Sequence, residues 1–204
     1  MELFINGESV NTAESAASNM AGLINQLVGE GKIAPRQVVA RILLDSEEAQ
    51  VPADGLAAME VTPGARVDLT IREPEDLLRP MLEDGIQFCD AVVGHCGRVA
   101  AQYRTDTVDV ASQEMVKLLD SFRVFTRFMQ QIRVFIKGHF DVEECFNDSL
   151  EHYARTMNDL MVAQEGEDWL HLADLLEYEF RDVFEKFVMA MDCQWKLVAP
   201  QKDA

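Results

Sequence analysis

The most regular pattern in this chain is a run of apolar residues between about residues 107 and 137, separated alternately by three and four positions. This spacing places every member on one side of an α-helix, and about four heptads of it are typical of a helix packed lengthwise against other helices. The members are Val108, Ala111, Met115, Leu118, Phe122, Phe125, Met129, Ile132 and Ile136. The pattern therefore predicts one long helix with a buried face.

Three further segments have helical periodicity, at about residues 80–104, 142–164 and 167–193. The connections between the successive segments are short, and short connections make consecutive long helices antiparallel neighbours. The sequence from residue 74 to residue 204 therefore predicts an antiparallel four-helix bundle.

Two local features of these helices lead to specific expectations. Gly85, Gly94 and Gly97 lower the helix propensity of the first segment by about 1 kcal/mol each relative to alanine, and close approach of a second helix would explain why they are tolerated. The residues from Asp141 to Glu144 have the spacing of a capping box, which predicts that the third helix begins there.

The first seventy residues change periodicity several times, as a small mixed α/β module does. Asn6-Gly7 follows a short apolar run and predicts a tight hairpin turn, because both residues of such a turn need positive φ. A stripe of apolar residues predicts a helix at about residues 20–28, capped by Ser18 or Ser15. The other predicted elements are strands at 38–44 and 66–71 and a helical turn at 56–59.

This order of hairpin, helix, strand, connector and strand resembles the ubiquitin-like β-grasp fold over about residues 1–72. The resemblance implies a mixed sheet that wraps one helix, and a role as a docking module. Pro74 marks the end of this part, since the pattern is helical throughout beyond it. We therefore expect an α+β protein with a β-grasp-like module at residues 1–73 and the helical bundle at residues 74–204.

The charge balance restricts the partners that we expect. The chain has 36 acidic and 18 basic residues, a net charge of −18, which argues against binding to nucleic acid or to an anionic membrane surface. Neither a signal peptide nor an apolar stretch of membrane-spanning length is evident, so we expect a cytoplasmic protein. In that compartment the four cysteines, at positions 89, 96, 145 and 193, are expected to be reduced, buried thiols.

The sequence contains no recognisable catalytic motif, so we expect no enzyme, no cofactor and no catalytic or metal-binding residue. A bundle rich in carboxylates also raises the alternative of a metal- or small-ligand-binding protein, acting as a sensor or accessory factor. Di-metal bundles use a Glu-x-x-His motif twice, and here only His171 has a carboxylate three residues before it, at Asp168. His171 lies off the apolar stripe of its helix, so we expect it to face solvent.

The one basic stretch of the chain lies between Ser121 and Gly138 and contains four cations and no acid. Two interpretations remain open. This is either a central bundle helix whose cations pair with acidic neighbours, or an interface with a partner or a second subunit. The expected function is non-enzymatic protein–protein interaction, as an adaptor or small chaperone-like factor and as a homodimer. The candidate interface residues are Phe122, Phe125, Phe128, Phe135, Arg123 and Arg127.

Overall fold

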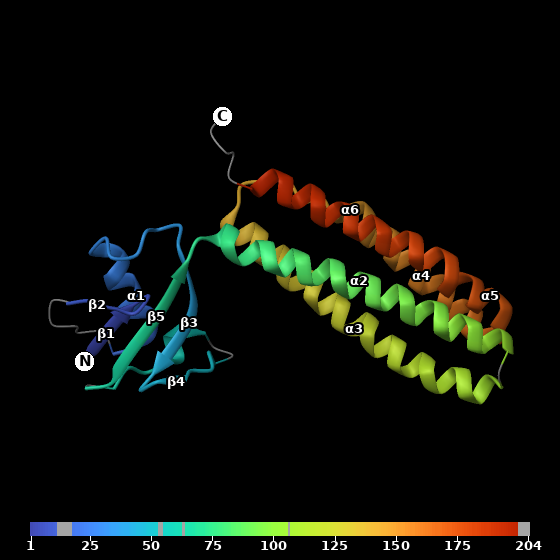
Figure 1. Ribbon diagram of the computed structural model, residues 1–204, viewed down its shortest axis with the longest axis horizontal. Coiled ribbons are helices and arrows are strands. Elements are labelled where there is room, and N and C mark those ends of the chain that lie inside the picture. The colour runs from blue at the N-terminus through green and yellow to red at the C-terminus, as the bar shows by residue number, and fades with distance from the viewer. Residues whose placement is uncertain (12–17, 53–54, 63, 106, 200–204) are drawn as a thin grey trace. The chain divides into compact units, whose positions relative to one another are not determined.

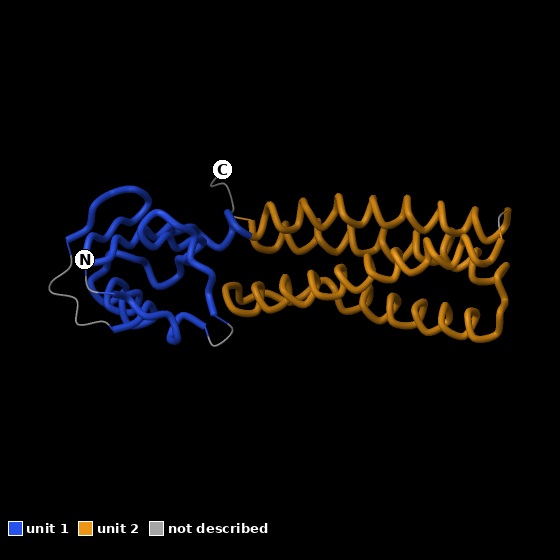
Figure 2. The backbone as a smooth tube through the Cα atoms, turned by 90° about the horizontal axis from the view of Figure 1, so that it is seen from below, with its two compact units in different colours: residues 1–77 blue, residues 78–204 orange. Residues whose placement is uncertain are grey.

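The computed structural model describes residues 1–11, 18–52, 55–62, 64–105 and 107–199. The chain divides into two compact units, residues 1–77 and residues 78–204 (Figure 2). The first unit contains a mixed sheet and the second is helical, so the protein belongs to the α+β class (Figure 1). Helix α2 begins at Pro74, a residue that suits the first helical position because its fixed φ is already helical.

The sheet of the first unit has five strands in the order β2-β1-β5-β3-β4. Strands β1 and β5 are parallel, and the other neighbours are antiparallel. The strands are β1 (Glu2–Ile5), β2 (Glu8–Ser9), β3 (Val38–Leu44), β4 (Glu47–Glu48) and β5 (Arg66–Arg72). The strands predicted at residues 38–44 and 66–71 are confirmed.

The turn between β1 and β2 is the predicted Asn-Gly turn. Asn6 and Gly7 have φ values of 50° and 82°, which glycine adopts freely and asparagine more readily than other residues. The side-chain oxygen of Asn6 also accepts a hydrogen bond of 2.9 Å from the backbone N–H of Ile71. This bond fastens the hairpin turn to the central strand β5.

Helix α1 (Met20–Gly29) contributes Met20, Leu23 and Leu27 to the first unit's core. Its N-cap is Asn19, whose side chain accepts a 2.8 Å hydrogen bond from the N–H of Gly22, so the expectation of Ser18 as the cap is wrong, and Ser15 lies outside the described residues. The predicted turn at residues 56–59 is confirmed as the short helix η1 (Leu56–Ala58). The core of this unit consists of Leu3, Met20, Leu23, Leu27, Ile33, Ile42, Met59, Val67, Leu69 and Ile71.

The second unit consists of long helices that run side by side (Figure 1). They are α2 (Pro74–Thr105), α3 (Val108–His139), α4 (Asn147–Glu165), α5 (Trp169–Asp174) and α6 (Phe180–Val198), with the π-helical turn η2 (Leu175–Glu179) between α5 and α6. The apolar stripe of α3 is buried as predicted, except that Val108 at its start is 37% exposed. A single hydrophobic cluster joins the facing sides of the helices.

The expected start of the third long helix is wrong, because α4 begins at Asn147 and residues 140–146 are not helical. Glu144 pairs instead with Arg133, at 2.7 Å, and with Lys137, at 3.4 Å, both on α3. Cys145 is bonded to Cys193 of α6. The ion pairs of Glu144 with α3 and the disulfide from Cys145 to α6 hold this segment in a non-helical conformation. The residues from Asp141 to Glu144 therefore do not cap α4.

Candidate interaction site on helix α3

A shallow hollow of about 700 Å³ lies along the C-terminal half of α3. We call it the α3 hollow. It is lined by Met81 of α2 and by Arg127, Gln130, Gln131, Val134, Phe135, Gly138 and His139 of α3. Val134 is 73% exposed. Its apolar side chain therefore lies in solvent, on a side of α3 away from the buried stripe.

Aromatic contacts position Phe135, an apolar side chain that lines the α3 hollow. Phe135 is half-buried, and its ring centroid lies 4.7 Å from that of His139 and 6.4 Å from that of Phe140. Gly138 is exposed and contributes no side chain. The hollow is therefore bounded by the rings of Phe135 and His139 and by the exposed backbone at Gly138, which leaves room for a side chain of another molecule.

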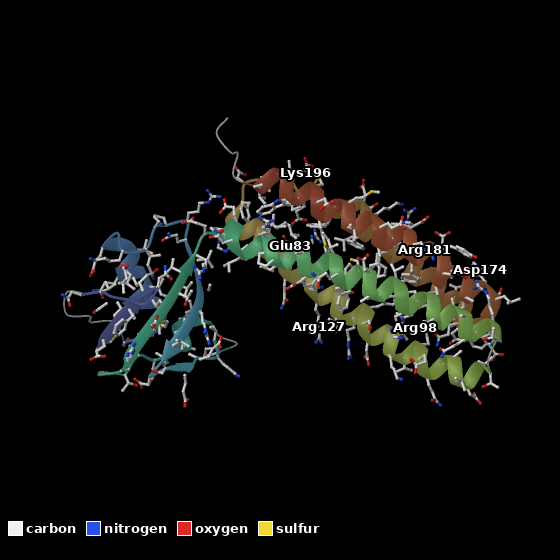
Figure 3. The ribbon with its side chains drawn as sticks, in the orientation of Figure 1. Glu83, Arg98, Arg127, Asp174, Arg181 and Lys196 are labelled. Atoms are coloured by element: carbon white, nitrogen blue, oxygen red, sulfur yellow. A yellow bond between two sulfur atoms is a disulfide. The ribbon has the colours of Figure 1, made fainter. Side chains whose placement is uncertain are left out.

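The four cations of α3 between Ser121 and Gly138 fall into two groups. Three of them form ion pairs, whereas Arg127 pairs with no carboxylate among the described residues. The pairs are Arg123–Asp120 at 2.9 Å, Arg133–Glu144 at 2.7 Å and Lys137–Glu144 at 3.4 Å. Figure 3 shows Arg127 on the outer side of α3. The expectation that these cations pair with acidic neighbours is confirmed for three of them, and the fourth lies at the α3 hollow.

Two of the six candidate interface residues are buried in the core, and the other four are half-buried or exposed. Phe122 and Phe125 are 2% and 0% exposed, so their assignment to an interface is corrected: both lie in the core. Phe122 stacks on Phe180, with 4.6 Å between ring centroids, and Phe125 meets Phe187 edge to face at 4.8 Å. They fill the interior because they belong to the three-and-four stripe that faces the other helices.

Of the other four candidates, Phe135 and Arg127 line the α3 hollow. Phe128 is half-buried and packs over Gly85 of α2, and Arg123 is exposed beside Asp120. The pattern did not reveal Val134, Gln130 and Gln131, because exposed residues off the apolar stripe look like any solvated helix face. Met81 reaches the hollow only through the packing of α2 against α3, so no local signal could have identified it.

Comparison with known families places the hollow inside a recognised domain. The sequence pattern of a domain of unknown function, DUF8042, matches residues 80–189. The chain belongs to the DUF8042 family. The matched residues begin within α2 and end within α6, so they include all the residues that line the α3 hollow. No curated protein and no solved structure matches the chain.

Two kinds of structure are absent from the described residues of the chain. No group of three or more His, Cys, Asp or Glu side chains there is arranged to hold a metal ion. No helix in the described part of the chain has the length and apolar character needed to cross a membrane. The half-match at Asp168 and His171 has a structural role, because the Asp168 carboxylate caps α5 by accepting a 3.1 Å hydrogen bond from the backbone N–H of His171. The His171 side chain is exposed, as expected.

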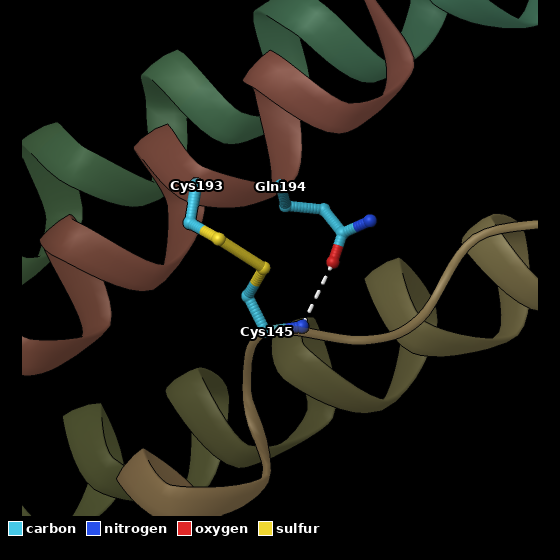
Figure 4. Close-up of a disulfide and its surroundings, with 3 residues drawn as sticks. All are labelled: Cys145, Cys193 and Gln194. Carbon is cyan, nitrogen blue, oxygen red and sulfur yellow. Dashed lines mark hydrogen bonds between the residues drawn. A yellow bond between two sulfur atoms is a disulfide. The ribbon is translucent and has the colours of Figure 1, made fainter.

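The cysteines divide into a bonded pair and two buried thiols. Cys145 and Cys193 form a disulfide, with 6.3 Å between their Cα atoms, so the expectation that they are reduced is wrong (Figure 4). Beside it, the side-chain oxygen of Gln194 accepts a 3.0 Å hydrogen bond from the N–H of Cys145. Cys89 and Cys96 are free and 1% exposed, as expected, and burial raises the pKa of each thiol to about 12.

Proposed function

We propose that this protein is a non-enzymatic protein–protein interaction module, an adaptor or small chaperone-like factor, and that its DUF8042 domain binds a partner in the α3 hollow. One observation carries the proposal. The hollow combines an exposed valine and a half-buried phenylalanine with Arg127, a cation that no described carboxylate neutralises. Apolar area beside an available charge is typical of a protein-binding surface.

The occupant that we propose is an amphipathic helix of a partner protein with an acidic residue at the edge of its apolar face. Such a helix presents apolar side chains at intervals of three and four residues, which Val134 and Phe135 can contact. Its carboxylate would pair with Arg127, and the amides of Gln130 and Gln131 would bond to polar groups at the rim. In a chain with net charge −18, this local positive charge also favours an acidic segment over a basic one at this surface.

The proposal includes a finer description of the architecture. The helices α2, α3, α4 and the α5–α6 pair would form an antiparallel four-helix bundle, a scaffold that presents α3 as a rigid surface. The first unit would be a ubiquitin-like β-grasp module and a second docking element. The central parallel pair of β1 and β5 and the single helix packed on the sheet support this description.

Self-association as a homodimer is part of the same proposal and uses the other half of α3. Val116 and Val124 are 61% and 52% exposed and lie eight residues apart on this helix. Asp120 and Arg123 lie between them, and an antiparallel two-fold arrangement can pair such opposite charges across an interface. Light scattering should give the mass of a dimer for the wild type and of a monomer for Val116→Glu. The cytoplasmic location stays a prediction.

Site-specific crosslinking tests the binding site. A photoreactive amino acid placed at position 134 of the full-length protein should capture one defined partner, whereas the same group at position 116 should capture only a second copy of this chain. The purified partner should then bind Arg127→Glu and Val134→Glu about tenfold or more weakly than the wild type, because each change removes a contact from the hollow. The matched control is Arg98→Glu, which reverses the charge of an exposed arginine on α2. Equal affinity of the partner for the wild type and both hollow variants would refute the proposal.

A further inference from the structure

The disulfide between Cys145 and Cys193 is open to solvent on one side. Cys193 is exposed on α6, whereas Cys145 is half-buried in the segment that leads into α4. Both cysteines line a hollow of about 490 Å³, which we call the disulfide hollow. An exposed cysteine that borders such a hollow can be approached by a small thiol, whereas Cys89 and Cys96 are only 1% exposed, although Cys89 lines another hollow.

The charged groups that line the disulfide hollow favour an anion. Arg155 and Lys186 face a single carboxylate there, that of Asp148. The Lys186 ammonium lies 2.9 Å from Nδ1 of His152, and because an ammonium can only donate, this contact places the imidazole proton on Nε2 when His152 is neutral. The residues that line the hollow therefore include two cations and one acid, and the carboxylate of Glu179, outside this lining, lies 3.9 Å from Nε2 of His152.

We propose that Cys145–Cys193 is a reversible thiol–disulfide exchange site for small thiols that carry a carboxylate, with Arg155 and Lys186 binding that carboxylate. The thiol of such a ligand would enter beside Cys193, the more exposed of the two cysteine residues. The site is separate from the α3 hollow, and the inference does not depend on the proposed function.

The exchange proceeds in two balanced steps. The ligand thiolate attacks Sγ of Cys193, a new S–S bond forms to the ligand, and the Cys145–Cys193 bond breaks to leave Cys145 as a thiolate. A second ligand thiolate then attacks the ligand's sulfur in this mixed disulfide and releases the Cys193 thiolate and the oxidised ligand dimer. Both protein thiolates take a proton from water. Two ligand thiols lose two electrons in total, and the protein disulfide gains them.

The position of Cys145 suits its role as the leaving group. It directly precedes Phe146, the N-cap of α4, and the positive end of a helix dipole stabilises a nearby thiolate. The hydrogen bond from the N–H of Cys145 to Gln194 would continue to hold the backbone near α6 after the disulfide opens. The two cysteines would then stay close enough to re-form the bond.

A comparison of three thiols tests the proposal. The full-length oxidised protein is treated with 3-mercaptopropionate, 2-mercaptoethanol or cysteamine, which are anionic, neutral and cationic, and reduction is followed by alkylation and mass spectrometry. For each thiol the rate with Arg155→Gln/Lys186→Gln is divided by the rate with the wild type, so that the reactivity of the thiol itself cancels. We expect the double variant to be reduced roughly threefold to tenfold more slowly than the wild type by 3-mercaptopropionate, and no more slowly than the wild type by the other two thiols.

Two control variants keep this test decisive if the double variant folds poorly. Arg181→Gln removes a cation of α6 that does not line the disulfide hollow, and should leave the three rates unchanged. Asp148→Asn removes the acid of the hollow, and should speed reduction by 3-mercaptopropionate alone. The proposal would be overturned if the rate relative to wild type were the same for all three thiols in Arg155→Gln/Lys186→Gln, and also the same for all three in Asp148→Asn. Four free thiols in protein purified without reductant would do so as well.

Discussion

Gly85 of α2 lies so close to Phe128 of α3 that a Cβ atom on residue 85 would stand 2.7 Å from Cε1 of the phenyl ring. The same Cβ atom would be 2.9 Å from both Sδ and Cε of Met191 on α6. Three helices therefore meet at a position where an added side chain would force Phe128 or Met191 to shift. Gly97 on the same helix has nothing within 4 Å of the corresponding point, so its lack of a side chain is not required by packing.

Gly85→Ala should lower the free energy of unfolding by up to about 2 kcal/mol, because overpacking typically costs about 1–3 kcal/mol and the gain in helix propensity offsets about 1 kcal/mol of it. Met191 is fully buried and has little room to withdraw from the added methyl group. Urea unfolding followed by circular dichroism gives the value.

Gly97→Ala is the matched control and should raise stability by about 0.5–1 kcal/mol, because it gains helix propensity without a clash. If the two variants changed stability in the same direction, close packing would not be the reason for Gly85.

The three glycines show what the sequence could and could not predict. Their placement on a heptad seam indicated close helix contact, and this holds at Gly85 but not at Gly94 or Gly97, where a Cβ atom would meet no other helix. Periodicity shows which face of a helix is buried. It does not give the axial alignment of two helices, and that alignment decides which glycine lies at the crossing.

Met129→Asp should abolish the cooperative unfolding of the helical unit. Met129 is 1% exposed in the middle of the α3 stripe, and an aspartate there must either bury a charge without a partner or become protonated. We expect a loss of more than about 4 kcal/mol, measured by thermal denaturation. The neighbouring substitution Gln130→Asp adds the same side chain at an exposed position and should change stability by less than about 0.5 kcal/mol. A cooperative melt in Met129→Asp would show that α3 is placed wrongly.

Lowering the pH through 6.5 should destabilise the helical unit through His95. Burial, together with the nearby charge of Arg98, lowers the pKa of this imidazole from its ordinary value of 6.5, with Lys117 acting in the same direction and Glu114 in the opposite one. The unfolded chain therefore takes up this proton at a higher pH than the folded chain does. The contribution of His95 to stability is complete above pH 6.5 and is lost as the pH falls through 6.5 towards the folded-state pKa.

Melting temperatures measured from about pH 8 to about pH 5.5 test the predicted effect of His95 on stability, since that interval spans the ordinary range of histidine titration. His95→Gln should melt with a weaker dependence on pH than the wild type over the lower part of this interval. His171→Gln, which alters an exposed histidine of α5, should follow the wild-type curve. Identical pH profiles for His95→Gln and the wild type would contradict the assignment.

The elements that the sequence did not reveal share a physical cause. The hairpin from β3 to β4 turns at Asp45 and Ser46, whose φ values of 49° and 74° are left-handed without glycine, so the usual turn signal is missing there. The Cys145–Cys193 bond joins residues 48 positions apart, and no spacing rule identifies such a pair. Both depend on tertiary contacts, which override local propensity, whereas β3 and α3 carry their own periodic signal.

Reduction of the disulfide should lower the stability of the helical unit by about 4 kcal/mol, because the chain-entropy estimate for a loop of 48 residues has that size. The bond ties the segment before α4 to α6, and its loss leaves the Gln194 hydrogen bond as a weaker tie between the same two places. Thermal melts with and without tris(2-carboxyethyl)phosphine measure the difference. The Cys145→Ser/Cys193→Ser variant should melt near the reduced wild type and should not respond to reductant, whereas Cys89→Ser should keep the full response because it leaves the disulfide intact. A wild-type melting temperature that reductant does not change would show that this bond does not stabilise the folded chain.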